Sequence, residues 1–290
     1  MSTVPRQRSE SECLTQLFEP GPHAGIGVHD PLSAVVAERM GCGFLWVSSF
    51  AVSAARGMPD AGLLEASTMV STVDHIARVI TLPVVVDMDA GYGDPLKVLH
   101  AVDRMTRSGA TAVCIEDNPV SKRSSLYSGY DRILVSIEEQ CARIEAAKSG
   151  IAGRPCGVIA RTEALVAGLG TEEALARADA YTQSGADAVF VQAVSPNGLD
   201  ELLAFCESWA RRTFVFIAPT CYTHYPRSQM HAAGASHYIF ANQGVRAAHG
   251  AMATTFRNLL DSEVGLEAEE GISSVADVAA EVGEHLVAAP

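Results

Sequence analysis

Eight short apolar runs rich in Val, Ile and Phe recur along the chain, and a longer stretch with the pattern of an amphipathic helix follows each of them. The runs are hydrophobic without interruption, which is typical of strands buried on both faces of a parallel sheet. They cover residues 25–29, 44–49, 83–89, 112–117, 157–163, 188–193, 214–219 and 237–242. This alternation predicts a series of βαβ units.

Several of the predicted helices end in glycine before the next apolar run, as at Gly41, Gly109, Gly185 and Gly234. A glycine just past the last helical turn can close the helix and turn the chain back. Eight units in a row, with no GxGxxG after the first strand, favour a closed (β/α)8 TIM barrel over an open doubly wound sheet. The 290 residues leave room for one such barrel, which commonly takes about 250.

We divide this single structural domain into an N-terminal segment, 1–24, the barrel, 25–260, and a C-terminal helical tail, 261–290. A helix is expected over 243–260, and a second apolar-patterned stretch covers 272–287. This tail is expected to cap the barrel or to pack on another subunit. Two connections from strand to helix, 50–67 and 118–136, are long, and long loops in compact folds are often functional lids.

The composition excludes several classes of protein. Hydrophobic residues make up 48%, which excludes a disordered chain, and 21 basic against 34 acidic residues give a net charge of −13. This charge argues against nucleic-acid and anionic-membrane partners. The polar start and the lack of an apolar run of about 18 residues predict a cytoplasmic protein without a membrane anchor. Seven scattered cysteines without a CxxC pair predict reduced thiols.

Polar side chains stand where the predicted strands end, and in a TIM barrel the carboxyl ends of the strands form the active-site rim. These residues are His29, Asp30, Ser48, Ser49, Asp87, Asp89, Glu116, Asp117, Arg161, Glu163, Gln192, Thr220 and Asn242. We expect them to gather on one rim.

Carboxylates on two neighbouring strands suggest a metal site on this rim. Alternation along a strand would point Asp87 and Asp89 to the same side, and Glu116 comes from the next strand. Oxygen ligands without thiolates suit Mg2+, with Mn2+ as an alternative, rather than zinc. The competing interpretation is that the aspartates cap helices and that Glu116 is only solvated.

Two cationic positions have two interpretations each. Arg161 could bind an anionic substrate group, or it could form a structural ion pair with Glu163. Lys122 lies on the Ser-rich loop after the fourth strand, where it could bring positive charge to a closed site or be merely solvated.

Five sequence motifs resemble the phosphoenolpyruvate mutase and isocitrate lyase superfamily, most closely its phosphoenolpyruvate mutase and phosphonopyruvate hydrolase branch. They are GVHDPLSA at 27–34, WVSSFAVS at 46–53, DMDAGYG at 87–93, IARTEA at 159–164 and AGLG at 167–170. The resemblance runs from about residue 25 to 249 and implies a Mg2+-bound 2-oxo acid that passes through an enolate.

The resemblance also implies roles for individual residues. Asp87 matches the direct metal ligand, and Asp60, Asp89 and Glu116 match residues that hold the waters of the metal. The positions that match substrate-binding residues are Trp46, Ser48, Ser49, Phe50, Asn118, Ser125, Arg161 and Gln192. Backbone amides near Ser49 and Phe50 match an oxyanion pocket, and Arg161 matches the side chain that grips the transferred group. Asp60, Lys122, Ser124 and Arg161 are the expected catalytic residues.

The segment EDNPVSKRSS at 116–125 departs from the mutase motif EDKxxxKxNS. Lys122 keeps the second lysine, whereas Asn118 replaces the first lysine and Ser124 replaces the asparagine. A hydroxyl residue at 124 resembles the hydrolases and favours hydrolysis. Gln192 stands where the phosphonate enzymes have histidine, so the pocket loses up to two positive charges.

The leading hypothesis is a Mg2+-dependent enzyme that makes or breaks the carbon–phosphorus bond of a small anionic 2-oxo acid. An alternative is a carbon–carbon lyase or oxaloacetate-type hydrolase, although the lyase sequence KRCGH lacks its Cys and His here, where Ser124 and Ser125 follow Arg123. A third is a barrel that binds an oxo acid without turnover. The resemblance further implies a homo-oligomer, a dimer or tetramer with exchanged terminal helices.

Overall fold

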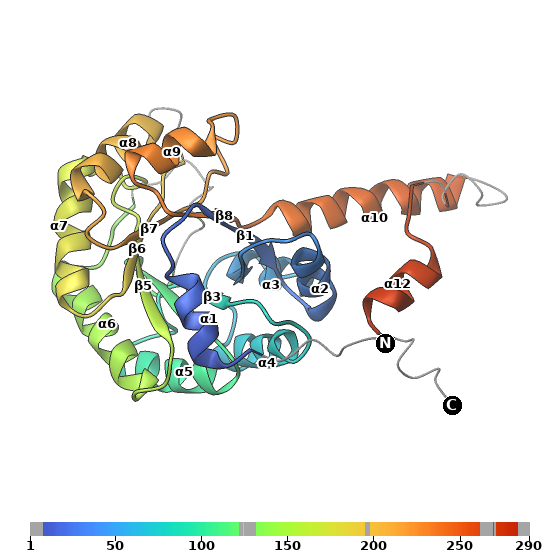
Figure 1. The fold of residues 1–290 in the computed structure, drawn as a ribbon, viewed down its shortest axis with the longest axis horizontal. Helices are drawn as coiled ribbons and strands as arrows, with labels where there is room; N and C mark the ends of the chain where they lie inside the picture. Colours follow the sequence, from blue (N-terminus) through green and yellow to red (C-terminus); the bar gives the residue numbers. More distant parts are fainter. Residues whose placement is uncertain are drawn as a thin grey trace.

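A computed structural model describes residues 8–121, 124, 132–194, 198–261, 269 and 271–283 of the chain. Eight parallel strands close into a barrel in chain order, with the last strand paired to the first (Figure 1). They are β1 His23–Val28, β2 Phe44–Val47, β3 Val84–Asp87, β4 Ala112–Glu116, β5 Gly157–Thr162, β6 Ala188–Val191, β7 Phe214–Ile217 and β8 His237–Phe240. Each lies within or next to a predicted run, and the TIM barrel is confirmed.

Helices surround the barrel and also extend from it (Figure 1). They are α1 Glu10–Leu17, α2 Pro31–Arg39, α3 Ser49–Ala55, α4 Ala66–Ala77, α5 Pro95–Arg107, α6 Ile137–Ile151, α7 Gly170–Gln183, α8 Gly198–Trp209, α9 Arg227–Ala233, α10 Gln243–Asp261 and α12 Val275–Glu281. The expectation of one long loop over 50–67 was wrong in its first part, because α3 follows directly on β2 with Ser48 as its N-cap. With only 7 residues, α3 is too short to show a clear helical pattern in the sequence.

Two apolar layers explain why the strands read as continuous hydrophobic runs. Inside the barrel, Phe44, Trp46, Phe190 and Phe216 are almost fully buried. Between the barrel and its helices, alternate strand residues such as Val86 pack against the helix faces. Both faces of each strand are therefore removed from water, which is the main source of stability for such a sheet.

Helix α1 closes the barrel at the amino ends of the strands. The carbonyl oxygen of Leu17 lies 2.6 Å from Nε2 of His237, the first residue of β8, and the Ser236 hydroxyl lies 2.9 Å from its Nδ1. The His237 ring stacks on Phe216 with centroids 4.0 Å apart. Burial lowers the pKa of His237 to about 3, so this imidazole is neutral at physiological pH.

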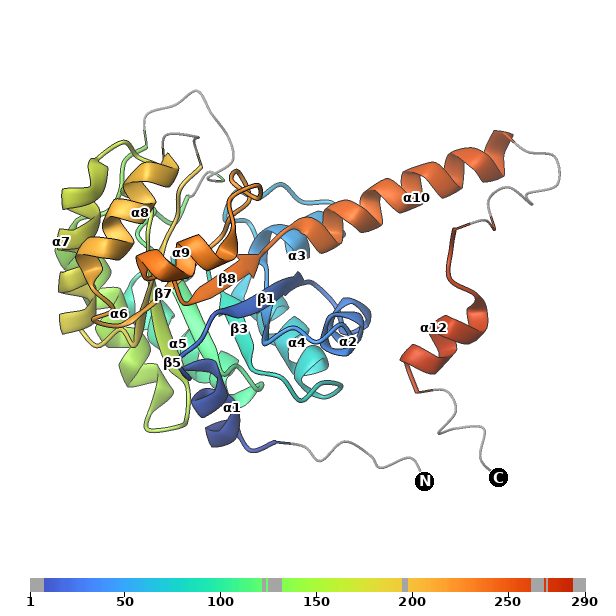
Figure 2. The same cartoon turned by 45° about the horizontal axis from the view of Figure 1, so that its top comes forward.

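Helix α10 leaves the barrel after β8 and projects away from it as a long arm (Figures 1 and 2). None of its residues is buried, and its apolar side chains Met252, Phe256, Leu259 and Leu260 are exposed. Beyond it, α12 lies back against α2, where Arg39 donates hydrogen bonds to Glu281 and to the carbonyl of Ala280, both at 3.1 Å. The predicted helices over 243–260 and within 272–287 thus have counterparts.

All seven cysteines are free thiols, as predicted. Among the described residues, none of the helices combines the length and the apolar character needed to cross a bilayer.

Candidate active site

A small pocket opens at the carboxyl ends of the strands, on the rim predicted from the sequence. Its lining residues are Trp46, Ser48, Ser49, Phe50, Asp60, Asp87, Ser124, Arg161, Phe190, Gln192, Ala218, Thr220, Ala241 and Asn242. Its free space is about 70 Å³, far below the roughly 300–1,000 Å³ of pockets for drug-sized ligands. The structure therefore brings most of the predicted site residues together around room for a small molecule.

Asp87 ends β3 and faces the start of α3. Its Oδ2 accepts hydrogen bonds from the hydroxyl of Ser49 at 2.8 Å and from the amide of Ser49 at 3.4 Å. The partial positive charge of a helix N-terminus stabilises a carboxylate placed there. The Ser49 amide, predicted as an oxyanion donor, is thus directed at Asp87.

Asp89 reaches the rim by a turn rather than by strand alternation. Strand β3 ends at Asp87, and Asp89 has a φ of 50°, which places it in the left-handed region. The expectation that one strand carries both aspartates on the same side was therefore wrong. The Asp89 amide lies 3.4 Å from Oδ1 of Asp87, and both carboxylates are buried. The turn thus still brings Asp89 back beside Asp87.

Arg161 and two glutamates form a buried charge cluster beside the pocket. Nε of Arg161 lies 2.7 Å from Glu163 and 3.3 Å from Glu116, and its guanidinium lies over the Phe190 ring at 4.8 Å. Burial would lower the pKa of Arg161, but Glu163 and Glu116 outweigh it and raise this pKa well above its usual value. Both interpretations of Arg161 hold in part: it is an ion-pair partner, and it lines the pocket.

Asn118 does not line the pocket. Its side chain donates a 3.0 Å hydrogen bond to Glu116, and only 4% of the residue is exposed. Asn118 is therefore placed to orient Glu116. Its predicted contact with substrate stays a prediction.

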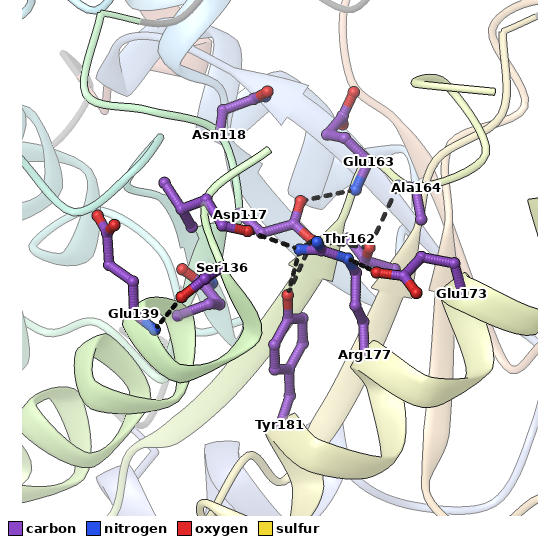
Figure 3. A network of polar contacts seen from close by, with 12 residues as sticks. Asp117, Asn118, Ser136, Glu139, Thr162, Glu163, Ala164, Glu173, Arg177 and Tyr181 are labelled. Carbon is purple, nitrogen blue, oxygen red and sulfur yellow. Dashed lines mark hydrogen bonds and ion pairs between the residues drawn. The ribbon is translucent and has the colours of Figure 1, made fainter. Parts of the chain in front are cut away.

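Asp117 is the centre of a buried network that joins the ends of β4 and β5 (Figure 3). Its carboxylate accepts hydrogen bonds from the Thr162 hydroxyl at 2.8 Å, the Glu163 amide at 2.9 Å, Tyr181 at 2.9 Å and Arg177 at 3.1 Å. Burial nevertheless raises the pKa of Asp117. Because Arg161 lies on β5 and Glu163 directly follows this strand, the network fixes the backbone that carries the charge cluster.

Arginines also bind the backbone at both ends of the connection between β4 and α6. Arg143 donates to the carbonyl of Asn118 at 2.9 Å, and Arg177 donates to the carbonyl of Val135 at 3.0 Å. Arg132 donates to the carbonyl of Ser124 at 2.6 Å, and the buried Ser124 lines the pocket. Lys122 and Ser125 lie outside the described residues, so their predicted roles stay predictions.

The rim formed by β6, β7 and β8 contributes neutral side chains. Gln192 is buried, and among the described residues its Oε1 has no hydrogen-bond partner. Thr220 and Asn242 follow β7 and β8, and both line the pocket. The sequence placed these two on the rim but assigned them no role, because nothing in the one-dimensional pattern shows that they touch each other.

The donor set fits a hydrated divalent cation better than a dehydrated one. In the described part of the chain, no group of three or more His, Cys, Asp or Glu could hold a metal ion. Mg2+, however, usually keeps several waters and takes only one or two carboxylates plus substrate oxygens. Asp60 and Asp87 both line the pocket and match that requirement.

A larger hollow of about 440 Å³ lies at the opposite end of the barrel, near Arg78 and Arg107. These two cations are already engaged, since Arg78 lies 2.8 Å from Asp74 and Arg107 lies 3.0 Å from Asp103. Active sites of this fold occupy the carboxyl ends of the strands, so we assign the site to the smaller pocket.

Comparison with known proteins identifies the family of the chain. The family model described as phosphoenolpyruvate phosphomutase matches residues 14–260. The chain belongs to this family. A phosphonopyruvate hydrolase from Variovorax sp. (strain Pal2) is 35% identical over 254 residues, which cover 87% of each chain. These members of the family are enzymes, such as phosphonopyruvate hydrolase and phosphoenolpyruvate phosphomutase, and the chain is an enzyme as well.

Two solved structures of the family share the fold over nearly their whole length. The phosphoenolpyruvate phosphomutase from Streptomyces platensis subsp. rosaceus has a TM-score of 0.91 with 35% identity. A phosphonopyruvate hydrolase in complex with oxalate and Mg++ has a TM-score of 0.88 with 31% identity. Each comparison covers 97% of both chains. The resemblance stated from the sequence motifs is thereby confirmed at the level of the superfamily.

Proposed function

We propose that this protein is a Mg2+-dependent phosphonopyruvate hydrolase, which cleaves the carbon–phosphorus bond of a 2-oxo acid through an enolate. The observation that carries the proposal is the composition of the pocket, where Asp60, Asp87, Arg161 and Ser124 line a space that fits only a small ligand. Support for the metal comes from the relative whose structure contains Mg++ and oxalate.

Asp87 and Asp60 would hold the cation, which when bound supplies positive charge beside the 2-oxo group. Around it, the chain fixes charges before substrate arrives. Ser49 holds the Asp87 carboxylate, and Asn118 with Arg161 holds Glu116. These contacts fix the positions of the carboxylates in advance, so that little reorganisation is needed when charge develops in the transition state.

Hydrolysis balances with water as the second reactant. Water adds to phosphorus, the carbon–phosphorus bond breaks, and its electron pair passes to the enolate of pyruvate. A proton then adds to carbon 3, so the products are phosphate and pyruvate. Arg161 keeps its charge throughout, because Glu163 and Glu116 raise its pKa, and it lies where it can meet the anionic phosphonyl group.

Ser124 favours hydrolysis over mutation in this proposal. It stands where the resemblance places asparagine in mutases, and its small side chain leaves room for water beside the phosphonyl group. The lyase alternative receives no support at this segment, because Ser124 stands where its Cys would be and Leu126 where its His would be.

Phosphorus NMR of the protein with phosphonopyruvate and Mg2+ tests the proposal. We expect release of inorganic phosphate, and chelation of the metal should stop it. Formation of phosphoenolpyruvate would identify a mutase instead, and an unchanged spectrum would overturn both. Ser124→Asn is expected to increase the ratio of phosphoenolpyruvate to phosphate, with Ser124→Ala as its control. The same ratio in both variants would remove Ser124 from the selection of product.

We also propose that the protein works as a homo-oligomer in the cytoplasm, with α10 covered by a second copy of the chain. Phe256 and Leu260 are 57% and 85% exposed on this arm, which is a large apolar surface to leave in water. Light scattering should report a dimer or tetramer, and Phe256→Asp combined with Leu260→Asp should shift it toward monomer. A monomeric wild-type protein would contradict this part of the proposal.

A further inference from the structure

A chain of hydrogen bonds runs from the base of α10 into the pocket. Nη1 of Arg246 donates to Oδ1 of Asn242 at 3.1 Å, and Nδ2 of Asn242 donates to Oγ1 of Thr220 at 3.3 Å. Thr220 and Asn242 line the pocket, whereas Arg246 is exposed on α10 outside it. The hydrogen bonds thus connect Arg246, through Asn242, to the hydroxyl group of Thr220.

The chemistry of these groups fixes the direction of the chain. A guanidinium can only donate hydrogen bonds, so the amide oxygen of Asn242 must face Arg246. The amide nitrogen then faces Thr220 and can only donate. Since the Thr220 oxygen accepts this bond, its own proton is left to be donated elsewhere. Among the described residues no acceptor for that proton is found, and Thr220 borders the pocket.

The two sides of the pocket differ in charge. Asp60, Asp87 and Arg161 come from the β2–β5 side, whereas the β6–β8 side presents Gln192 and Thr220, which are neutral. Buried Gln192 adds an amide oxygen without a partner among the described residues. If the 2-oxo end of the substrate lies at Asp87, the other end of so small a ligand reaches this neutral side.

We propose that Thr220 is a substrate-binding residue whose hydroxyl donates a hydrogen bond to the anionic group that the reaction transfers. Asn242 and Arg246 are positioning residues, which act by orienting the Thr220 proton toward the pocket. The inference rests on the proposed function for the identity of the transferred group, a phosphonyl group. It makes the recognition of that anion depend on a neutral, oriented donor in addition to Arg161.

The test compares affinities for phosphonopyruvate and oxalate in Mg2+, read by stopped-flow fluorescence of Trp46, which lines the pocket, before turnover. Thr220→Val removes the donor and keeps the shape of the side chain, so we expect about tenfold weaker phosphonopyruvate binding. Oxalate lacks a transferred group, and its affinity should change less than about twofold. Thr220→Ser should bind as the wild type does, and so should Thr223→Val, a control on the same connection outside the pocket.

Asn242→Asp separates orientation from simple contact. An aspartate accepts hydrogen bonds from both Arg246 and Thr220, so it keeps the contact with Arg246 but turns the Thr220 proton away from the pocket. We expect this variant to lose about as much phosphonopyruvate affinity as Thr220→Val does. Combining the two substitutions should then cause no additional loss, whereas additive losses would mean that the new charge, not the proton, is responsible.

Three results would overturn the inference: wild-type affinity in Thr220→Val, an equal loss for oxalate, or a wild-type protein that does not bind phosphonopyruvate. The proposed function fails separately. A wild-type protein that binds phosphonopyruvate without releasing phosphate would contradict hydrolysis, while the effect of Thr220→Val on affinity would still support the role of Thr220.

Discussion

At the floor of the barrel, His237 is packed against Phe44, Phe214 and Phe216, and both of its ring nitrogens lie at hydrogen-bond distance from protein oxygens. At the rim, Asp87 and Arg161 are also largely buried, yet they face a pocket. The floor keeps His237 neutral, whereas at the rim the neighbouring glutamates keep Arg161 charged. The same scaffold therefore separates a closed end that supports the fold from an open end that holds charge for chemistry.

Removing charge from the rim should have the largest effect, and mainly on activity. Asp87→Ala is expected to reduce phosphate release by about a thousandfold or more, because a catalytic metal ion supplies several kcal/mol of transition-state stabilisation. The Tm without metal should stay near the wild-type value. Asp74→Ala, at the other end of the barrel, is the matched control. An active Asp87→Ala enzyme would show that the rim carboxylate is not a metal ligand.

The network around Asp117 is intermediate between the rim pocket and the floor. It lies at the carboxyl end of β4, but Asp117 is fully buried in protein. Arg177→Met should lower the free energy of unfolding by about 3–5 kcal/mol, since it leaves the Asp117 carboxylate buried without its ion-pair partner. Adding Asp117→Asn should recover part of that loss. Urea denaturation of both single variants and the double variant measures this. Additive losses would contradict an ionic role for the pair.

At the floor, the effect should be smaller and confined to acid. Because His237 titrates at about 3 in the folded protein and near 6.5 when unfolded, the unfolded chain binds the extra proton between these values. Stability is therefore lost as the pH falls from 6.5 toward 3, by at most about 1.4 kcal/mol per pH unit.

His237→Gln keeps a donor for the Leu17 carbonyl and cannot titrate. Its unfolding free energy, measured in urea from pH 7 to pH 4, should decline less steeply than that of the wild type. His249→Gln, on the exposed α10, should follow the wild-type slope. Parallel slopes for wild type and His237→Gln would show that the floor histidine does not control acid stability.

The barrel could be predicted because strands buried on both faces leave an uninterrupted apolar record in the sequence. The rim could be predicted for the same reason, since Asp87, Glu116 and Arg161 stand at or next to the ends of those runs. The left-handed turn at Asp89 left no such record, nor did the start of α3 directly after β2.

Contacts between distant residues were also beyond the sequence. Arg177 meets Asp117 from 60 positions away, and Asn242 meets Thr220 across 22. Nothing in local pattern pairs them, because the closure of the barrel brings them together. The direction of α10 was likewise open, since an amphipathic helix reads the same whether it covers its own barrel or another copy.

A crystal of the protein soaked with Mn2+ and oxalate tests the charged rim most directly, because Mn2+ gives an anomalous signal where Mg2+ does not. We predict one anomalous peak in the pocket beside the Asp87 carboxylate, with oxalate bound to the same ion. A difference map with oxalate in the pocket and no cation next to Asp87, or a cation bound only elsewhere, would contradict the metal-dependent mechanism.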